Sequence, residues 1–404
     1  MHAIPGGVCA AKGFKASGIH CGLRKNKALK DLALIVSDVP ASAAAVYTQN
    51  LVKGAPILVT KEHIQNGMAQ AILCNSGNAN TCNADGPYVA KRMCELAGAA
   101  LSIDTTDVIV ASTGVIGQPL PIGPIESGMG ALVEALGYEN SLDAARAIMT
   151  TDLAVKECAV SFTAGGKTCR IGGIAKGSGM IHPNMATMLV FITTDAAIAP
   201  AMLQKALSGD ILDTFNMVSV DGDTSTNDMV AVLANGLAGN DTIISENGDY
   251  AAFCAALKEI TSRLCRAIAK DGEGATKLLT CKVSGANDTV TARRVAKSVV
   301  CSSLLKAAMF GADANWGRVL CAIGYAGADV DIRKVDVSFA SGAGHIDVCK
   351  SGAGVPFSEE IAKDILLRDE IDILVCLNSG ACAATAWGCD LTYDYVKING
   401  DYRS

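Results

Sequence analysis

Near the middle of the chain lies the stretch Lys176-Gly-Ser-Gly-Met-Ile-His-Pro-Asn-Met-Ala-Thr-Met-Leu-Val-Phe-Ile-Thr-Thr-Asp195, which changes character abruptly at Thr187. Before Thr187 come glycines, a proline and an asparagine, which favour turns and tight backbone conformations. After it comes the apolar run 188–192, of the kind that a buried strand needs. Thr187 therefore lies at a predicted loop-to-strand junction.

A threonine at the start of a strand gains a free α-amino group if the chain is cut in front of it. An α-amino group titrates near pH ~8, and a threonine paired with its own amine is a known nucleophile arrangement. The alternative is a glycine-rich loop that only leads into a core strand. The stretch by itself leaves both interpretations open.

Length and composition predict a well-buried globular protein. At 404 residues the chain exceeds the size at which one hydrophobic core usually stops growing, so two domains or two closely packed lobes are expected. Hydrophobic residues make up 50% of the chain, aromatic residues only 4%, and 41 residues are glycine. This composition indicates a core of small side chains and excludes disorder.

Charge and apolar patterning argue against nucleic acids and membranes as partners. The formal net charge is −6, and no run of Lys and Arg creates a local basic patch, so nucleic acid is not expected to bind. No apolar stretch approaches the ~20 residues of a membrane span, so no membrane partner is expected either.

The 16 cysteines are scattered from Cys9 to Cys389 and include no C-x-x-C pair. The five histidines are isolated from one another, so zinc-type ligand spacing is absent and no metal is expected. No apolar signal-peptide region follows Met1, because basic residues interrupt the early apolar ones. The pattern therefore indicates reduced, mostly buried cysteines in a cytoplasmic protein.

Strand-like and helix-like segments alternate along the chain, which predicts an α/β protein. This periodicity does not distinguish a sandwich from a doubly wound sheet. Strands are predicted at residues 32–37, 45–48, 56–60, 70–74, 107–112, 157–162, 169–174, 188–192, 217–220, 229–233 and 278–281. Helices are predicted at residues 88–101, 125–136, 144–149, 200–212, 250–269 and 291–310.

Several loops carry polar groups suited to chemistry. Thr113 and Gly114 follow a strand, where a hydroxyl and adjacent amides suit an oxyanion hole, although a plain turn is the commoner meaning of Thr-Gly. Lys176 heads the central loop, where its ammonium could hold a carboxylate. Glu273 lies between two glycines on a tight loop. The acidic segment 221–228 lacks the glycine and glutamate positions of a calcium loop, so a turn bonded by its own side chains is preferred.

Taken together, these motifs resemble the ornithine acetyltransferase family, the glutamate N-acetyltransferases of arginine biosynthesis. The resemblance covers the chain from about Gly6 to Ser404, with small departures after Asn80 and at Gly400. The motifs that carry it are Gly6-Gly7 with Lys12-Gly13-Phe14, Asn75-Ser-Gly-Asn-Ala-Asn80, Ser112-Thr-Gly114, Thr150-Thr-Asp152, the central stretch up to Thr187, Asp221-Gly-Asp-Thr-Ser-Thr-Asn-Asp228, Asp271-Gly-Glu-Gly-Ala-Thr276, Gly311-Ala-Asp-Ala-Asn-Trp-Gly317 and the closing 398–404.

The resemblance implies a mechanism. Members of the family cut themselves at the position of Ala186 and Thr187, which gives an α chain of residues 1–186 and a β chain of residues 187–404. Thr187 then takes the acetyl group from N-acetylornithine and passes it to glutamate in a ping-pong reaction. The family pattern assigns the oxyanion hole to Thr113 and Gly114. It assigns substrate binding to Thr151, Lys176, Thr187, Glu273, Asn399 and Ser404.

The implied fold is the self-processing α/β sandwich that this family shares with related aminopeptidases, with two interleaved lobes. The implied assembly is an α2β2 heterotetramer of the cleaved chains. No cofactor is implied, and the sequence leaves open whether acetyl-CoA serves as a second acetyl donor. The alternative function is a self-processing aminopeptidase or amidase that releases the acyl group to water.

Overall fold

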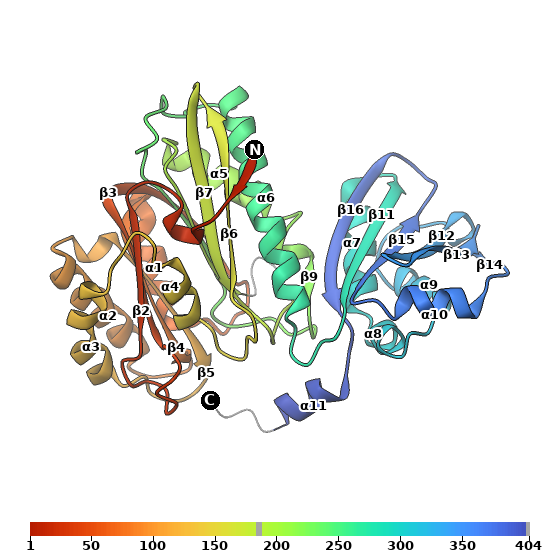
Figure 1. Cartoon of the computed structure of the whole chain (residues 1–404), viewed down its shortest axis with the longest axis horizontal. Helices are drawn as coiled ribbons and strands as arrows, with labels where there is room; N and C mark the ends of the chain where they lie inside the picture. The colour runs from red at the N-terminus through yellow and green to blue at the C-terminus, as the bar shows by residue number, and fades with distance from the viewer. Residues whose placement is uncertain (183–187, 401–404) are drawn as a thin grey trace.

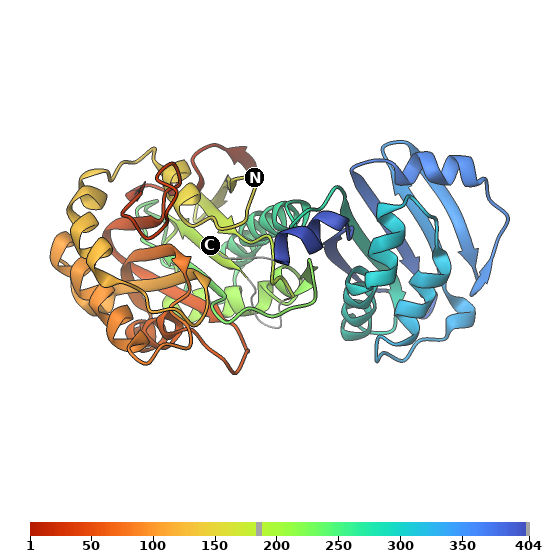
Figure 2. The ribbon, with the colours of Figure 1, turned by 90° about the horizontal axis from the view of Figure 1, so that it is seen from below.

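The computed structural model describes residues 1–182 and 188–400, and in that part of the chain two β-sheets form the centres of two lobes (Figure 1). The first sheet has nine strands and the second has seven within these ranges. Helix α11, Tyr393–Asn399, runs from the second lobe back toward the first and lies between them in the view from below (Figure 2). The prediction of two packed lobes is confirmed.

The strands of the first sheet are β1 His2–Ile4, β2 Phe14–Ile19, β3 Leu32–Tyr47, β4 Met68–Asn78, β5 Val108–Val115, β6 Lys156–Ala164, β7 Lys167–Lys176, β8 Leu189–Thr194 and β10 Met229–Ala234. The strands of the second sheet are β9 Val218–Ser219, β11 Leu278–Ala286, β12 Asp336–Ser341, β13 Gly344–Lys350, β14 Ala353–Gly354, β15 Glu370–Cys376 and β16 Cys382–Cys389.

The remaining α-helices are α1 Ala55–His63, α2 Gly86–Leu101, α3 Ile122–Glu134, α4 Ser141–Ala147, α5 Pro200–Asp210, α6 Gly248–Lys270, α7 Thr289–Cys301, α8 Ser303–Phe310, α9 Trp316–Gly324 and α10 Glu359–Leu366. Over the described ranges, none of the helices combines the length and apolar character that crossing a membrane requires.

Strand β8 begins with the apolar run 189–192, and both of its faces are covered. Val190 and Ile192 pack in one core cluster with side chains of α6, whereas Leu189 and Phe191 pack in another with side chains of α4. A strand buried on both faces shows a continuous apolar run rather than alternation. The strand predicted at 188–192 is thus confirmed, and its sequence follows from its central place in the sheet.

In the first sheet, the two strands that follow Thr187 in sequence are inserted between strands that precede it. The strand order is β1-β6-β7-β8-β10-β3-β4-β5, with β2 also paired to β3. Strands β8 and β10 therefore stand between β7 and β3, antiparallel to both and parallel to each other. Residues 1–186 and 187–404 do not form separate lobes, and the expected interleaved α/β architecture is observed.

Two features join the lobes. The short strand β9 leaves the first lobe and pairs in parallel with β16 of the second sheet. Helix α6 contacts β6 and β7 of the first sheet and β11 and β16 of the second (Figure 1). One core cluster consequently runs from β8 through α6 to β11 and α7.

The strand predicted at residues 56–60 is wrong, because this segment lies in α1. Pro56 occupies the first turn of the helix, where its missing N–H costs nothing. Thr60 exchanges hydrogen bonds with the backbone of Val110 on β5, donating to its carbonyl at 2.8 Å and accepting from its amide at 2.9 Å. These tertiary contacts outweigh the strand propensity of the β-branched residues.

Two further boundaries differ from prediction. The predicted helix at 291–310 is interrupted at Ser302, whose hydroxyl accepts a hydrogen bond from the Leu305 amide at 3.3 Å and so begins α8. The strands predicted at 32–37 and 45–48 are one long strand, β3, with an irregular register between Val36 and Ala41. The other predicted helices and strands overlap observed elements.

Strand β7 packs closely against η1, Gly7–Cys9. We therefore expect the replacement of one glycine of β7, Gly172, to lower stability. A Cβ on Gly172 of β7 would overlap the carbonyl oxygen of Gly7. We expect Gly172→Ala to lower the free energy of unfolding by about 1–3 kcal/mol through overpacking. The matched control is Gly130→Ala in α3, where a Cβ meets open space and helix propensity favours Ala by about 0.5–1 kcal/mol. Urea unfolding measures both, and equal stability of the two variants would contradict this packing.

Candidate functional site

Six of the predicted site residues line one cavity. Its volume is about 110 Å³, and it lies where β5, β7 and several loops meet. Thr187, Ala186 and Ser404 lie outside the described residues. The predicted residues in the cavity wall are Thr113, Gly114, Thr151, Lys176, Glu273 and Asn399. Positions as distant as 113 and 399 are thus brought together, while the role of each stays a prediction.

Parallel pairing of β4 with β5 sets the position of Thr113 and Gly114. Ser76 pairs with Thr113 and Gly77 with Gly114, so the polar segment 75–80 lies directly beside the predicted oxyanion hole. Gly114 has φ +132°, and a Cβ there would overlap the backbone of Gly77. Only glycine satisfies both constraints. The strand continues through Thr113 and Gly114 to Val115, three residues beyond the predicted end at residue 112.

Lys176 is the last residue of β7, and its ammonium points at the predicted oxyanion hole. Its Nζ donates to the Thr113 hydroxyl at 3.2 Å, and the residue is only 9% exposed. Because the Thr113 oxygen already accepts this bond, its own proton is free to be donated elsewhere. A buried cation and a hydroxyl donor suit the stabilisation of negative charge that develops on an acyl oxygen.

A buried ion network supports Lys176 and the start of the central loop. Lys156 Nζ lies 2.6 Å from Asp152 Oδ1 and 2.6 Å from Asp271 Oδ2. Asp152 Oδ1 also accepts from the Gly177 amide at 2.7 Å. Burial alone would raise the pKa of Asp152, but the charges of Lys156 and Lys176 lower it to about 2. The bond between Asp152 and Gly177 therefore holds the segment that contains Thr151 next to the end of β7, where Lys176 lies.

Glu273 and Asn399 form the opposite wall. The Asn399 amide nitrogen donates to Glu273 Oε2 at 2.6 Å, so the end of α11 contacts the loop before β11. The Glu273 backbone amide donates to the Ser178 carbonyl at 2.9 Å. A Cβ on Gly179 would overlap the Glu273 carboxylate, which explains the glycine beside it.

Among the described residues of the cavity wall, Lys176 and Glu273 are the charged ones. One cation and one anion across a small cavity match the carboxylate and ammonium groups of an amino acid. The neutral members supply hydroxyl, amide and backbone groups for orientation. The cavity is therefore equipped to bind a zwitterion and to stabilise an oxyanion.

Sequence reasoning missed three supporting side chains. Asp221 accepts hydrogen bonds from the amides of Met180 and Ile181 at 2.6 and 2.8 Å, in addition to the predicted bond within its own turn from Asp223 at 3.3 Å. Asn227 donates to the carbonyls of residues 79 and 112. Lys156 was missed although the four-residue spacing from Asp152 was a visible signal.

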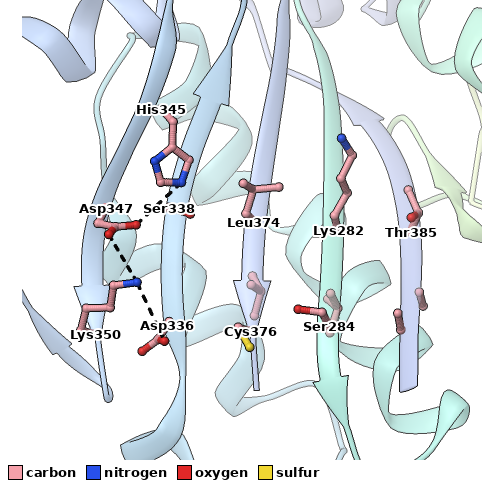
Figure 3. A pocket seen from close by; sticks show the side chains of 14 residues that line it. Lys282, Ser284, Asp336, Ser338, His345, Asp347, Lys350, Leu374, Cys376 and Thr385 are labelled. Atoms are coloured by element: carbon pink, nitrogen blue, oxygen red, sulfur yellow. Dashed lines mark ion pairs between the residues drawn. The ribbon is translucent and has the colours of Figure 1, made fainter. Parts of the chain in front are cut away.

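A larger open hollow of about 650 Å³ lies on one face of the second sheet (Figure 3). It contains none of the predicted site residues. Lys350 lies 3.3 Å from Asp347 and 4.0 Å from Asp336, and the His345 ring lies 3.7 Å from Asp347 (Figure 3). These charged side chains of the hollow therefore already pair with one another. We therefore place the candidate site at the smaller cavity.

The cysteines give no sign of crosslinking. All 16 are free; seven are buried, seven half-buried, and Cys82 and Cys321 are exposed, so they are less uniformly buried than predicted. Within residues 1–182 and 188–400, no group of three or more His, Cys, Asp or Glu side chains is arranged to hold a metal ion.

Comparison with known proteins gives a family match over most of the chain. The pattern of the ArgJ family matches residues 15–404. The arginine biosynthesis bifunctional protein ArgJ of Symbiobacterium thermophilum is 50% identical over 406 residues, covering 100% of both chains. ArgJ 1 of Clostridium acetobutylicum is 51% identical over 392 residues, covering 97% of this chain and 96% of its own. The crystal structure of ArgJ from Bacillus halodurans has 48% identity and a TM-score of 0.50, covering 53% of this chain and 98% of its own.

The ion network predicts a pH-dependent contribution to stability. The pKa of Asp152 is depressed below its usual 3.8, so its contribution is present above about pH 4 and is lost as the pH falls toward 2. We expect Asp152→Asn to destabilise the protein by about 3–5 kcal/mol near neutral pH, because Lys156 loses a buried partner. Urea unfolding should show a loss about 1 kcal/mol smaller at pH 3 than at pH 6.

The exposed Asp241→Asn serves as the control and should change the free energy of unfolding by less than about 0.5 kcal/mol at both pH values. An Asp152→Asn penalty that is the same at pH 3 and pH 6 would contradict the depressed pKa.

Proposed function

Because the chain belongs to the ArgJ family of arginine-biosynthesis enzymes, we propose that it transfers an acetyl group from N2-acetylornithine to glutamate. The observation that carries this proposal is the convergence of Thr113, Gly114, Lys176 and Glu273 on one cavity. An acyl-oxygen site and a pair of opposite charges are the two requirements for acyl transfer between amino acids.

The proposed nucleophile is Thr187, with its own α-amine as the base. Its Oγ forms a bond to the acetyl carbonyl carbon while the Oγ proton passes to the amine. The carbonyl oxygen becomes an oxyanion next to Thr113 and Gly114. Collapse breaks the C–N bond, the ornithine amine takes the proton, and acetyl-Thr187 is left. Glutamate then attacks through its amine, and the same steps in reverse give N-acetylglutamate and free Thr187.

Self-cleavage between Ala186 and Thr187 is part of the proposal, because the α-amine exists only after the cut. Its support comes from the chain on either side. Ile181 and Met188, which lie on either side of the proposed cut in the sequence, both line one small cavity together with Thr113 and Lys176. The solved Bacillus halodurans chain is matched over 98% of its length but covers only 53% of this chain, so it is about half as long. Residues 187–404 are likewise just over half of the 404 residues.

We further propose that Lys176 and Glu273 bind the charged ends of the substrates, the cation facing a carboxylate and the anion facing an ammonium. Thr151 and Asn399 are proposed to orient the substrate, with Ser404 added by the family pattern. Acetyl-CoA as a second donor, an α2β2 assembly and a cytoplasmic location belong to the same proposal. The word bifunctional in the names of the relatives supports the second donor.

Acceptor dependence separates the proposed transferase from the hydrolase alternative. We expect ornithine release from N-acetylornithine to require glutamate, with N-acetylglutamate formed in equal amount. Mass spectrometry of both products, with and without glutamate, makes the measurement. Acetate released at the same rate in either condition would establish the hydrolase instead. Acetyl-CoA in place of N-acetylornithine tests the second donor in the same assay.

Denaturing gel electrophoresis tests self-cleavage. We expect purified protein to run as two chains, and Thr187→Ala to run as one chain of full length, because the nucleophile of the cut is missing. Edman sequencing of the longer of the two chains should start at Thr187, because residues 187–404 are just over half of the 404 residues. The control is Thr106→Ala in the 3-10 helix Thr105–Asp107, where the side chain is exposed, and this variant should be cut normally. A processed Thr187→Ala protein would show that the cut lies elsewhere.

A further inference from the structure

Met180 is the only hydrophobic residue among the described residues that line the candidate site. The residue is 42% exposed, and it also lines the adjoining cavity of about 20 Å³ together with Thr113 and Lys176. A large apolar side chain in the wall of a polar cavity stays in contact with water, so a ligand that covers it gains favourable apolar contact. The roles predicted for the other residues of the wall do not account for this side chain.

The backbone of Met180 has an uncommon conformation. Its φ is +56°, in the left-handed region that favours glycine. The Met180 amide donates to Asp221 Oδ2 at 2.6 Å, and the Ile181 amide donates to Asp221 Oδ1 at 2.8 Å. On the other side, Gly179 lies so close to the Glu273 carboxylate that a Cβ would overlap it. Backbone strain persists only where neighbouring groups hold it, and it is concentrated at functional sites. These contacts therefore hold Met180 at the cavity wall, one residue away from Glu273.

The two proposed substrates differ in the charge of their side chains. The ornithine side chain ends in an ammonium group, whereas the glutamate side chain ends in a carboxylate. The Glu273 carboxylate attracts the first group and repels the second, so this charge cannot bind both side chains. The methylene groups are common to both substrates, and glutamate has one fewer than ornithine. Because a methionine side chain is unbranched and flexible, it adapts to ligands of different length.

We propose that Met180 packs against the methylene groups of both substrates and sets the side-chain length that the site accepts. The inference rests on the proposed function and adds a specificity-determining residue to it. The substrate takes the exposed part of Met180 out of water, which favours side chains that carry methylene groups. A longer side chain meets Met180 and is disfavoured by overpacking. Met180 takes no part in the covalent steps.

The test is Met180→Ala in the full chain, assayed with glutamate as the acceptor and two donors. The donors are N2-acetylornithine and N2-acetyllysine, which is one methylene longer. We expect the KM for N2-acetylornithine and for glutamate to rise about tenfold with kcat unchanged, because apolar contact is lost while the reacting groups stay in place. The kcat/KM ratio that favours N2-acetylornithine over N2-acetyllysine should fall about tenfold, because the shorter side chain leaves room for the extra methylene.

Two controls accompany this variant. Met180→Leu keeps an apolar side chain of similar volume and should leave both KM values within about threefold of wild type. Met68→Ala makes the same truncation at the first residue of β4, at the other end of that strand from the site segment 75–78, and should change neither the KM values nor the donor ratio. If Met180→Ala is not cut or does not fold, Met180→Gln replaces it. Gln keeps the length of the side chain but makes its end polar, so both KM values should rise while the donor ratio stays the same.

The outcomes separate this inference from the function beneath it. A wild-type protein that does not transfer acetyl from N2-acetylornithine to glutamate would overturn the proposed function, and this inference with it. An active wild type whose Met180→Ala variant keeps the wild-type KM values and donor ratio would overturn the role of Met180 alone. A lower kcat with unchanged KM values and donor ratio would also overturn it, because Met180 would then support only the loop and not the choice of substrate.

Discussion

The buried contact of Lys156 with Asp152 and Asp271 is the interaction on which the rest of the site depends. It joins the loop before β6 to the loop that follows α6, and through Asp152 it also holds the amide of Gly177. A buried cation between two carboxylates is stable only while all partners are present. Removing one of them therefore loosens three chain segments that meet at the candidate site.

The same region shows why the lobes cannot be independent. Strands β8 and β10 complete the first sheet, while α6 and β9 carry the chain to the second. The end of α11 returns to contact Glu273 through Asn399. A cut at Thr187 would leave both products held by shared strands and one continuous core, so the cleaved protein is expected to remain a single folded unit.

Electrostatic preorganisation links this architecture to chemistry. The Lys176 side chain lies next to Thr113 and close enough to Asp152 to lower the pKa of that carboxyl, beside the proposed position of the acyl oxygen. In a site largely shielded from water these arrangements act more strongly than they would in solution, since little solvent has to reorganise during the reaction.

The sequence by itself determined the α/β class, most of the elements and the motif residues, because apolar periodicity and glycine-rich turns are local properties. The sequence pattern predicted a strand at residues 56–60, but this segment is a helix that bonds to Val110 through Thr60, and the pattern also missed Lys156. Only the tertiary structure decided that Thr113, Lys176, Glu273 and Asn399 share one cavity. The physical reason is that burial and hydrogen-bond partners depend on residues far apart in the chain, which no local pattern encodes.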